Sequence, residues 1–330
     1  MRQHKKRMMI LGIVIAALAL FLGLRFSDCR SKNQNWSLVY IPKTIDKTND
    51  FWTSLIAGVN MAAKEYGVSV EIMGPDREQD VERQNELLAQ AIEMKPDALM
   101  ISPSSFTESE ELLRTAKEKG IPVVYIDSYT KDEIQDLTVA TDNLEAGRKL
   151  GEYAAKLLDD DSRIAVVCHV KGVSTALERE QGFREGLGDK SENIAEVVYC
   201  DSMYEKSYRL TMELLGKYPD LELIAGLNEY SSVGAARAIR DSGLEGRVKV
   251  VGIDSSQEAV ELMEQGVFQC LVLQKAFKMG YLGLKETVKM LKGEHVEKNI
   301  DSGSEVVTPE NMYTSENEKL LFPFDSNGWE

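Results

Sequence analysis

Polar side chains stand at the ends of many of the chain's short apolar runs. The first run, "SLVYI", leads into a polar loop that ends in Asn49, Asp50 and two adjacent aromatics, Phe51 and Trp52. Side chains with a hydroxyl, amide or carboxylate end or follow the later runs: Ser102, Asp127, Asn143, Asn228, Asp254 and Gln274. Carboxylates and amides hydrogen-bond hydroxyl groups in planar pairs, and an aromatic face covers the apolar C–H surface of a sugar ring. These residue types therefore suit a ligand that is rich in hydroxyl groups.

Structural roles remain an alternative for each of these residues. Asp, Asn and Ser after a strand are also ordinary turn and helix-capping residues. The first residues of an amphipathic helix often pack onto the sheet, so Trp52 has a core position as its alternative to the ligand wall.

Motifs of reactive centres are missing from the sequence. The only histidines are His4, His169 and His295, neither HExxH nor GxSxG occurs, and no glycine-rich phosphate loop follows a strand. His169 comes directly after Cys168, but neighbouring strand residues point to opposite faces, so a solvent-facing or cleft-edge histidine is the simpler explanation. We expect no enzyme, no cofactor and no metal.

The cysteines do not form a recognisable module. Cys29, Cys168, Cys200 and Cys270 are widely spaced and none lies in a CxxC pair. Cys168 and Cys200 end the apolar runs "RIAVVC" and "AEVVYC", which favours small buried residues on neighbouring strands. A disulfide between these two stays open as the alternative in an exported protein.

The polar residues must be positioned by alternating strands and helices. Ten β-branched or apolar runs between residues 37 and 274 are separated mostly by amphipathic stretches, and several of these stretches end in Gly. Apolar strands joined by helices form parallel sheets, with ligand sites at the carboxyl ends of the strands. The chain is long for one domain. We therefore expect an α/β fold of two doubly wound lobes, each with a parallel sheet of about five strands, joined by a multi-strand hinge and with a ligand cleft between them.

The N-terminus differs from everything after it. Residues 1–7 are basic, and residues 8–24 contain no charged or strongly polar side chain, which is typical of an export signal or a membrane anchor. No convincing cleavage site follows, and Asp28 stands where a lipoprotein signal needs a small residue before Cys29. An uncleaved anchor is favoured, with a cleaved or lipidated signal as the alternative. The body would then lie outside the cytoplasm, and the net charge of -15 argues against a nucleic-acid partner.

The predicted organisation runs along the chain in six parts. A hinge is expected near Thr141 and Asn143, where a strand leads into a capped helix. The parts are a basic cytoplasmic segment (1–7), the anchor or signal (8–24), a linker (25–35), the first lobe (36–141 and 275–304), the second lobe (142–274 and 305–313) and a surface tail (314–330).

The order of the strand-end motifs resembles the periplasmic sugar-binding proteins of the ribose and galactose type, which share their fold with the effector domains of the lactose-repressor family. The resemblance covers residues 37–308. It is carried by "NDFW", "VVYID", "TDN", "REQGF", "LNEYSSVGA", "VVGIDSS" and "LVLQ" in this order. It implies ligand contacts from Asn49, Phe51, Trp52, Asp127, Arg179, Asn228, Asp254 and Gln274.

This sequence departs from the family pattern in places. Ser128 stands where an Arg often follows Asp127, and Ser202 and Ile253 stand where aromatics are common. Ribose itself is therefore not assumed, and the sugar stays undetermined.

The resemblance implies a receptor that closes its lobes on a sugar or related polyol. A membrane-tethered receptor that signals to a sensor kinase is our first hypothesis, and the substrate-binding component of a sugar ABC importer is the alternative. A repressor is excluded, because it needs a helix-turn-helix where this chain has its apolar segment.

Overall fold

The computed structural model describes residues 36–321 of the protein. The predictions for residues 1–35, including the basic segment, the anchor or signal, the linker and Cys29, lie outside the described residues, as does the end of the predicted tail. Within the described range, no helix has both the length and the apolar character needed to span a membrane.

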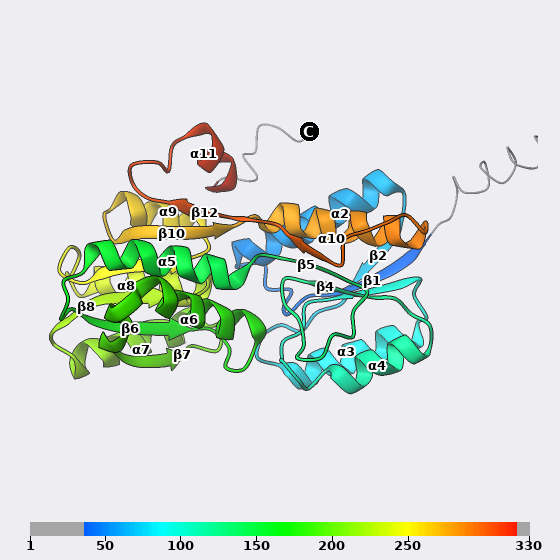
Figure 1. Ribbon diagram of the computed structural model, residues 1–330, viewed down its shortest axis with the longest axis horizontal. Coiled ribbons are helices and arrows are strands. Elements are labelled where there is room, and N and C mark those ends of the chain that lie inside the picture. Colours follow the sequence, from blue (N-terminus) through cyan, green and yellow to red (C-terminus); the bar gives the residue numbers. More distant parts are fainter. Residues whose placement is uncertain (1–35, 322–330) are drawn as a thin grey trace, which may run out of the picture.

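The first lobe is built on a six-stranded, fully parallel sheet. Its strands, in spatial order, are β11 (Asn299–Asp301), β5 (Leu137–Ala140), β4 (Val123–Ile126), β3 (Ala98–Ile101), β1 (Ser37–Ile41) and β2 (Ser69–Ile72). Helices α2 (Asp50–Tyr66) and α10 (Ala276–Leu291) cover one face, and α3 (Val81–Glu93) and α4 (Glu110–Glu118) cover the other (Figure 1).

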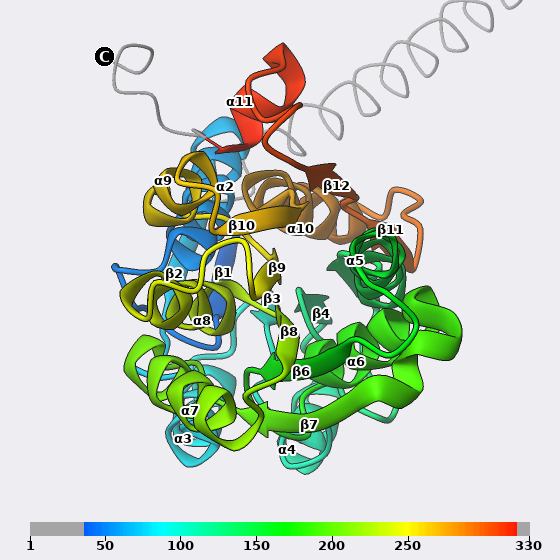
Figure 2. The same ribbon diagram turned by 90° about the vertical axis from the view of Figure 1, so that its left-hand side faces the viewer.

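The second lobe repeats this plan with one change of direction. Its sheet has the order β12 (Ser304–Val307), β10 (Phe268–Gln274), β9 (Lys249–Ile253), β8 (Leu221–Gly226), β6 (Arg163–Cys168) and β7 (Ile194–Tyr199), and only β12 is antiparallel. Figure 2 shows α5 (Asn143–Leu157) and α6 (Ser174–Leu187) on one side of this sheet. On the other side lie α7 (Tyr204–Lys217), α8 (Glu229–Asp241) and α9 (Gln257–Glu264).

The central strands are apolar on both faces because helices cover both faces. In β1, Leu38 and Tyr40 pack with α2 and α10, whereas Val39 and Ile41 pack with α3 and α4. This alternation explains the nearly continuous apolar runs, which are typical of parallel sheets.

The chain crosses between the lobes three times. The crossings follow β5, β10 and β11, and in Figure 1 they lie side by side between the two sheets. The hydroxyls of Thr141 and Ser302, on two of these crossings, lie 3.2 Å apart and share a hydrogen bond. The predicted fold class, two doubly wound lobes joined by a multi-strand hinge, is confirmed.

Two features of the fold differ from the sequence expectations. Strands β11 and β12 add a sixth strand to each sheet, and they were not predicted because both are short: β11 is largely exposed, and β12 has only two apolar residues at its end. The segment predicted as a surface tail contains helix α11 (Ser315–Leu321). Most of this helix is exposed at the surface, and Leu321 at its end packs into the core of the second lobe.

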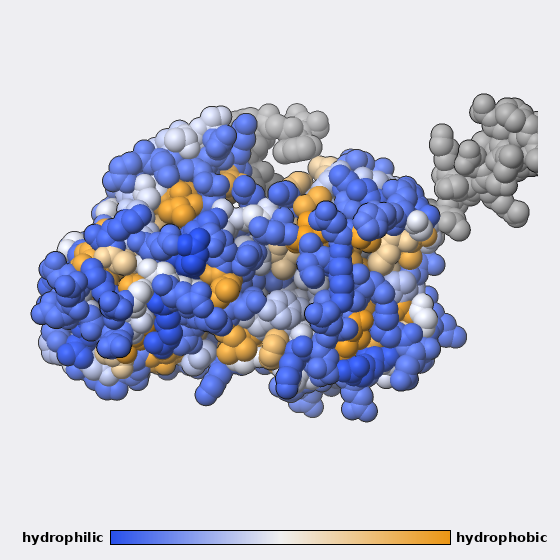
Figure 3. Space-filling view, viewed as in Figure 1, coloured by the Kyte–Doolittle hydropathy of each residue, from blue (hydrophilic) through white to orange (hydrophobic). Residues whose placement is uncertain are grey.

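The outer surface is mainly hydrophilic. Figure 3 shows small, separated hydrophobic patches on the face that it presents. The large apolar side chains are mostly in the cores of the two lobes.

Candidate ligand-binding cleft

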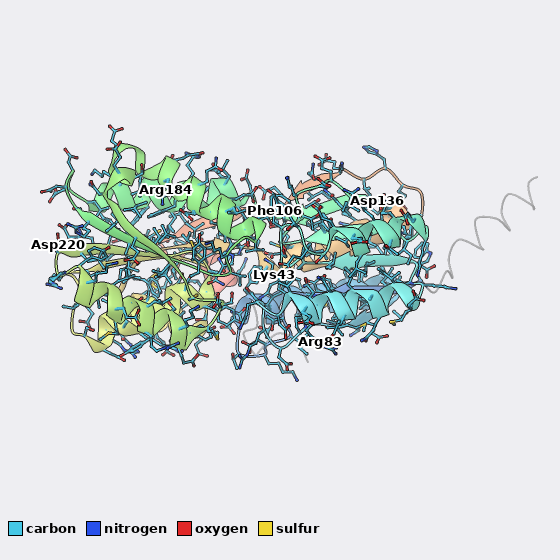
Figure 4. The ribbon with its side chains drawn as sticks, turned by 90° about the horizontal axis from the view of Figure 1, so that it is seen from below. Lys43, Arg83, Phe106, Asp136, Arg184 and Asp220 are labelled. Atoms are coloured by element: carbon cyan, nitrogen blue, oxygen red, sulfur yellow. The ribbon has the colours of Figure 1, made fainter. Side chains whose placement is uncertain are left out.

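A cleft lies between the two lobes, where the carboxyl ends of the two sheets face each other; its empty space is about 280 Å³ when the part open to solvent is included. Figure 4 labels Lys43 at the junction of the lobes. The first lobe lines the cavity with Lys43, Asn49, Phe51, Trp52, Glu78 and Asp127, and the second with His169, Thr175, Arg179, Asn228, Glu229, Asp254 and Gln274.

Each lobe places one buried aspartate in the cavity by the same backbone device. Asp127 follows β4 with a φ of 71°, and Asp254 follows β9 with a φ of 73°. A left-handed backbone is unfavourable for a residue with a Cβ, and such strain concentrates at binding sites. The equivalent turns direct two carboxylates into the cleft from opposite sides.

The first-lobe aspartate is directly paired with a lysine. Lys43 Nζ lies 2.7 Å from Asp127 Oδ2, and both side chains are almost fully buried. Lys43 Nζ also donates to Thr175 Oγ1 of the other lobe, at 3.4 Å. A buried ion pair of this kind neutralises the charge that Asp127 would otherwise bring into the cavity.

The second-lobe aspartate is held mainly by neutral donors. Gln274 Nε2 donates to Asp254 Oδ1 at 2.8 Å, and the Glu229 backbone N–H donates to Oδ2 at 3.2 Å. Arg179 Nη1 is 4.0 Å from Oδ2. Burial raises the pKa of Asp254 above its ordinary value, and Arg179 and Gln274 oppose this shift.

Arg179 is anchored by groups other than the aspartate. Its Nε donates to Asn143 Oδ1 at 2.8 Å, and its Nη1 donates to the Leu227 carbonyl at 2.9 Å. Asn143 therefore orients Arg179 and does not itself line the cavity. Arg179 lies in the second turn of α6.

The predicted ligand residue Ser102 also lies outside the cavity lining. Its side chain is fully buried, and its hydroxyl hydrogen-bonds the Tyr40 hydroxyl at 2.9 Å. The Ser102 carbonyl accepts from Gln84 Nε2 at 2.9 Å. The strand-end position is as predicted, but the side chain serves the interior of the first lobe.

The aromatic pair combines the two roles that the sequence left open. The rings of Phe51 and Trp52 are nearly perpendicular, with centroids 5.1 Å apart, and both line the cavity. Trp52 is only 2% exposed and belongs to the first-lobe core, and its indole N–H donates to Glu78. Trp52 is thus both a core residue and part of the cavity wall.

The two asparagines of the cavity likewise have capping roles. Asn49 Oδ1 accepts from the Trp52 N–H at 3.0 Å and caps α2. Asn228 Oδ1 accepts from the Ser231 N–H at 2.9 Å in a capping box at the start of α8. Both side chains border the cavity while fixing the helix behind it.

Five cavity residues were not among the predicted ligand residues: Lys43, Glu78, His169, Thr175 and Glu229. His169 and Glu229 had the strand-end signal, since they lie just after β6 and β8. Lys43 and Glu78 come from loops of the first lobe, where no periodic pattern marks them.

Several hydrogen bonds join the lobes around the cavity. The Glu229 carboxylate accepts from the backbone N–H groups of Asp50 and Phe51, at 3.3 and 3.0 Å. The Tyr230 hydroxyl donates to Asp46 Oδ2 at 2.8 Å, and the Ser202 hydroxyl donates to Glu78. The described structure is therefore a closed arrangement of the two lobes.

Burial keeps the charge of the cavity low. It raises the pKa of Glu229 to about 8, although bonds from Tyr204 and the Phe51 N–H oppose the shift. Burial also raises the pKa of Glu78, and it lowers the pKa of His169 well below its ordinary value. Near neutral pH, the protonated form of Glu229 and the neutral form of His169 are favoured.

The three cysteines within residues 36–321 do not form a disulfide with one another. Cys168, Cys200 and Cys270 are free and buried. Cys168 packs with α5 and α6, whereas Cys200 packs on the opposite face of the same sheet. The alternative of a disulfide between these two cysteines is therefore wrong. Among residues 36–321, no group of three or more His, Cys, Asp or Glu is arranged to hold a metal ion.

The family model of the periplasmic binding protein domain matches residues 39–295, most of the chain. The chain belongs to this family. The predicted recognition of a periplasmic sugar-binding protein of the ribose type is confirmed, and so is the expectation of a solute-binding protein rather than an enzyme. The family also supports the predicted extracytoplasmic location.

Relatives align with nearly the whole chain. The D-ribose/D-allose-binding protein of Pseudomonas aeruginosa is 25% identical over 323 residues, covering 96% of this chain and 100% of the relative. The ribose import binding protein of Bacillus subtilis is 27% identical over 254 residues, covering 77% of this chain and 82% of the relative.

Solved structures show the same architecture. A sugar transporter from Clostridium phytofermentans has a TM-score of 0.79 and 44% identity, covering 83% of this chain and 99% of that one. A carbohydrate transporter solute-binding protein from Agrobacterium radiobacter, in complex with D-arabinose, has a TM-score of 0.83 and 28% identity, covering 87% of this chain and 99% of that one.

Proposed function

We infer that the protein is an extracytoplasmic receptor that closes its two lobes on one small, neutral sugar. The observation that carries this inference is the cavity, where an aromatic pair from one lobe faces hydrogen-bonding side chains from both. Aromatic faces cover a sugar ring, and carboxylates, amides and guanidinium groups bind its hydroxyls. Contacts from both lobes stabilise the closed state over the open one.

The charges of the cavity favour a neutral ligand. Lys43 pairs with Asp127, and Arg179 lies near Asp254, so the two cations are each matched by a carboxylate. The remaining acids, Glu78 and Glu229, have raised pKa values. A sugar acid, sugar phosphate or amino sugar would bring an unmatched charge into a buried site, which is costly.

The test is a binding screen on the purified full-length chain in detergent. Pentoses, hexoses and polyols are titrated by calorimetry, including the D-ribose, D-allose and D-arabinose that appear in the names of the relatives. We expect saturable binding of at least one neutral sugar with one site per chain, and no binding of the corresponding sugar acid. Binding of no sugar or polyol would overturn the proposal.

The sugar-bound receptor has two candidate roles. The relatives support delivery to an ABC importer, since they include an import binding protein and a sugar transporter. The apolar residues 8–24, with no convincing cleavage site after them, support instead a tethered receptor that reports to a membrane sensor kinase. The intact mass of the protein extracted from native membranes separates the two: a chain that begins at Met1 supports the tether, whereas a lipid on Cys29 or a start after Leu24 supports transport.

A further inference from the structure

His169 occupies an unusual place in the cavity. It follows β6 directly, its side chain is 2% exposed, and it lines the space between the lobes. Its Nε2 lies 2.8 Å from the Thr175 hydroxyl oxygen. Its Nδ1 is buried and has no hydrogen-bond partner among the described residues. A buried polar atom of this kind normally has a partner.

The ring is neutral, and therefore it has one N–H and one acceptor nitrogen. Burial lowers the pKa of His169 well below its ordinary value, and the nearby charges of Arg179 and Lys43 lower it further. The remaining question is which nitrogen bears the hydrogen.

A chain of hydrogen bonds crosses the cleft from Lys43 to the His169 ring. Lys43 Nζ donates to Asp127 at 2.7 Å and to Thr175 Oγ1 at 3.4 Å. We assign the hydrogen of the Thr175 hydroxyl to His169 Nε2, which places the single hydrogen of the neutral ring on Nδ1. Lys43 and Asp127 belong to the first lobe and Thr175 and His169 to the second, so closure of the lobes brings this chain of groups together.

We propose that His169 is a specificity-determining residue, whose Nδ1–H donates to one hydroxyl oxygen of the bound sugar. A second unpartnered group supports this ligand chemistry, because Gln274 Oε1 is also buried in the cavity wall without a partner and accepts hydrogen bonds only. A sugar hydroxyl both donates and accepts, so neighbouring hydroxyls of one ligand satisfy both groups. The inference rests on the proposed function and adds a contact that is not among the predicted ligand residues.

Two substitutions separate a ligand contact from a structural role. His169→Asn keeps an N–H close to the position of Nδ1, whereas His169→Gln keeps one close to the position of Nε2, opposite Thr175. The sugar that wild type binds best in the screen is titrated into both variants and into His169→Ala. We expect His169→Ala and His169→Gln to weaken binding about tenfold, the loss typical of a hydrogen bond to a buried group, and His169→Asn to stay within about threefold of wild type.

Single-deoxy analogues of the same sugar identify the hydroxyl. Wild type should discriminate against an analogue that lacks the contacted hydroxyl, and His169→Ala should lose this discrimination at that one carbon only. Rescue by His169→Gln instead of His169→Asn, or equal affinity of His169→Ala and wild type, would overturn the proposal while the proposed function stands. Failure of wild type to bind any sugar would overturn both.

The tautomer provides a second test, which is made on the wild-type ring itself. The chain has three histidines, so the ring nitrogens of His169 can be assigned in a ¹⁵N-labelled sample by comparison with His169→Asn. We expect a neutral ring with the hydrogen on Nδ1 in the sugar-bound protein, and a change in the Nδ1 signal on sugar binding. A hydrogen on Nε2 in the bound state would contradict the proposal.

Discussion

The two lobes have the same scaffold but contribute different chemistry to the cleft. Each has a sheet between two helical layers, and each places an aspartate with a left-handed backbone at the carboxyl end of the sheet. The aromatic wall, Phe51 and Trp52, comes only from the first lobe, whereas the second lobe contributes polar side chains alone. We therefore propose that the first lobe covers the ring face of the ligand and that the second lobe hydrogen-bonds its hydroxyls.

The cation–carboxylate pair of the first lobe also differs from that of the second lobe. Lys43 contacts Asp127 directly at 2.7 Å, whereas Arg179 is 4.0 Å from Asp254 and is anchored by Asn143 and a backbone carbonyl. The first pair is a direct contact, whereas in the second the Asp254 carboxylate is held mainly by neutral donors.

The largest expected effect comes from breaking these pairs one at a time. Asp127→Asn leaves Lys43 as a buried, unpaired charge and should lower the free energy of unfolding by about 3 kcal/mol, the usual cost of breaking a buried ion pair. Asp254→Asn should cost clearly less, because Arg179 keeps its other two partners. Both should weaken sugar binding at least about tenfold. Urea unfolding and calorimetry measure the two quantities, and equal loss of stability in both variants would contradict the comparison.

A second prediction concerns the scaffold that the lobes share. In each lobe two helices touch at glycines: a Cβ on Gly58 of α2 would lie 2.1 Å from the Phe277 carbonyl oxygen, and one on Gly182 of α6 would lie 2.0 Å from that of Leu144. Gly58→Ala and Gly182→Ala should each cost about 2 kcal/mol, as overpacking does.

Gly216→Ala is the matched control for this pair. Gly216 also lies in a helix, α7, but a Cβ there meets no atom within 4 Å. This substitution should stabilise the protein by about 0.5–1 kcal/mol, because alanine is the better helix former. A similar loss in all three variants, measured by thermal unfolding, would show that helix contact is not the cause.

The sequence could predict the sheets and the strand-end positions, because apolar runs and the rule for parallel sheets determine both. It could not predict which strand-end side chains enter the cavity. Ser102 and Asp127 both follow strands, but only Asp127 has the left-handed backbone, and no sequence pattern reports φ for a non-glycine residue. His169 was predicted to be a solvent-facing or cleft-edge residue, but it is 2% exposed and lines the cavity, because the other lobe covers this side. Glu78 was missed because it reaches Trp52 from a loop between β2 and α3.

The aromatic wall gives the next prediction. Phe51→Ala should weaken sugar binding about tenfold with little change in stability, because Phe51 is only partly buried at the cavity edge. Trp52→Phe should abolish most of the sugar-induced change in tryptophan emission, since Trp52 borders the cavity. Fluorescence titration tests both, with Trp36→Phe as the control for the emission change. Intact binding in Phe51→Ala together with an unchanged emission signal in Trp52→Phe would place the ring face elsewhere.

The smallest expected effect is a pH dependence of closure that arises in the second lobe. In the closed state Glu229 meets the N–H groups of Asp50 and Phe51 across the cleft and the Tyr204 hydroxyl within its own lobe, and burial raises its pKa to about 8. The carboxylates of Asp50 and Asp254 act in the same direction. Opening the lobes exposes Glu229 to water and lowers its pKa toward the ordinary value, so closure takes up a proton between these two values.

Sugar affinity should therefore fall as the pH rises from 7 to 9, and the fall should level off above the raised pKa. Part of the burial of Glu229 comes from the second lobe itself and persists when the lobes open, so opening removes only part of the pKa shift. We therefore expect the sugar affinity to change by about threefold over this pH range. This pH range lies above the ordinary pKa of histidine, and the pKa of His169 is lower still, so protonation of His169 does not contribute to the change in affinity. Glu229→Gln should make the affinity less dependent on pH, with the residual slope due to Glu78, whose pKa is also raised and whose partner Ser202 lies in the opposite lobe. An affinity that rises with pH in wild type, or an unchanged slope in Glu229→Gln, would show that Glu229 does not couple protonation to closure.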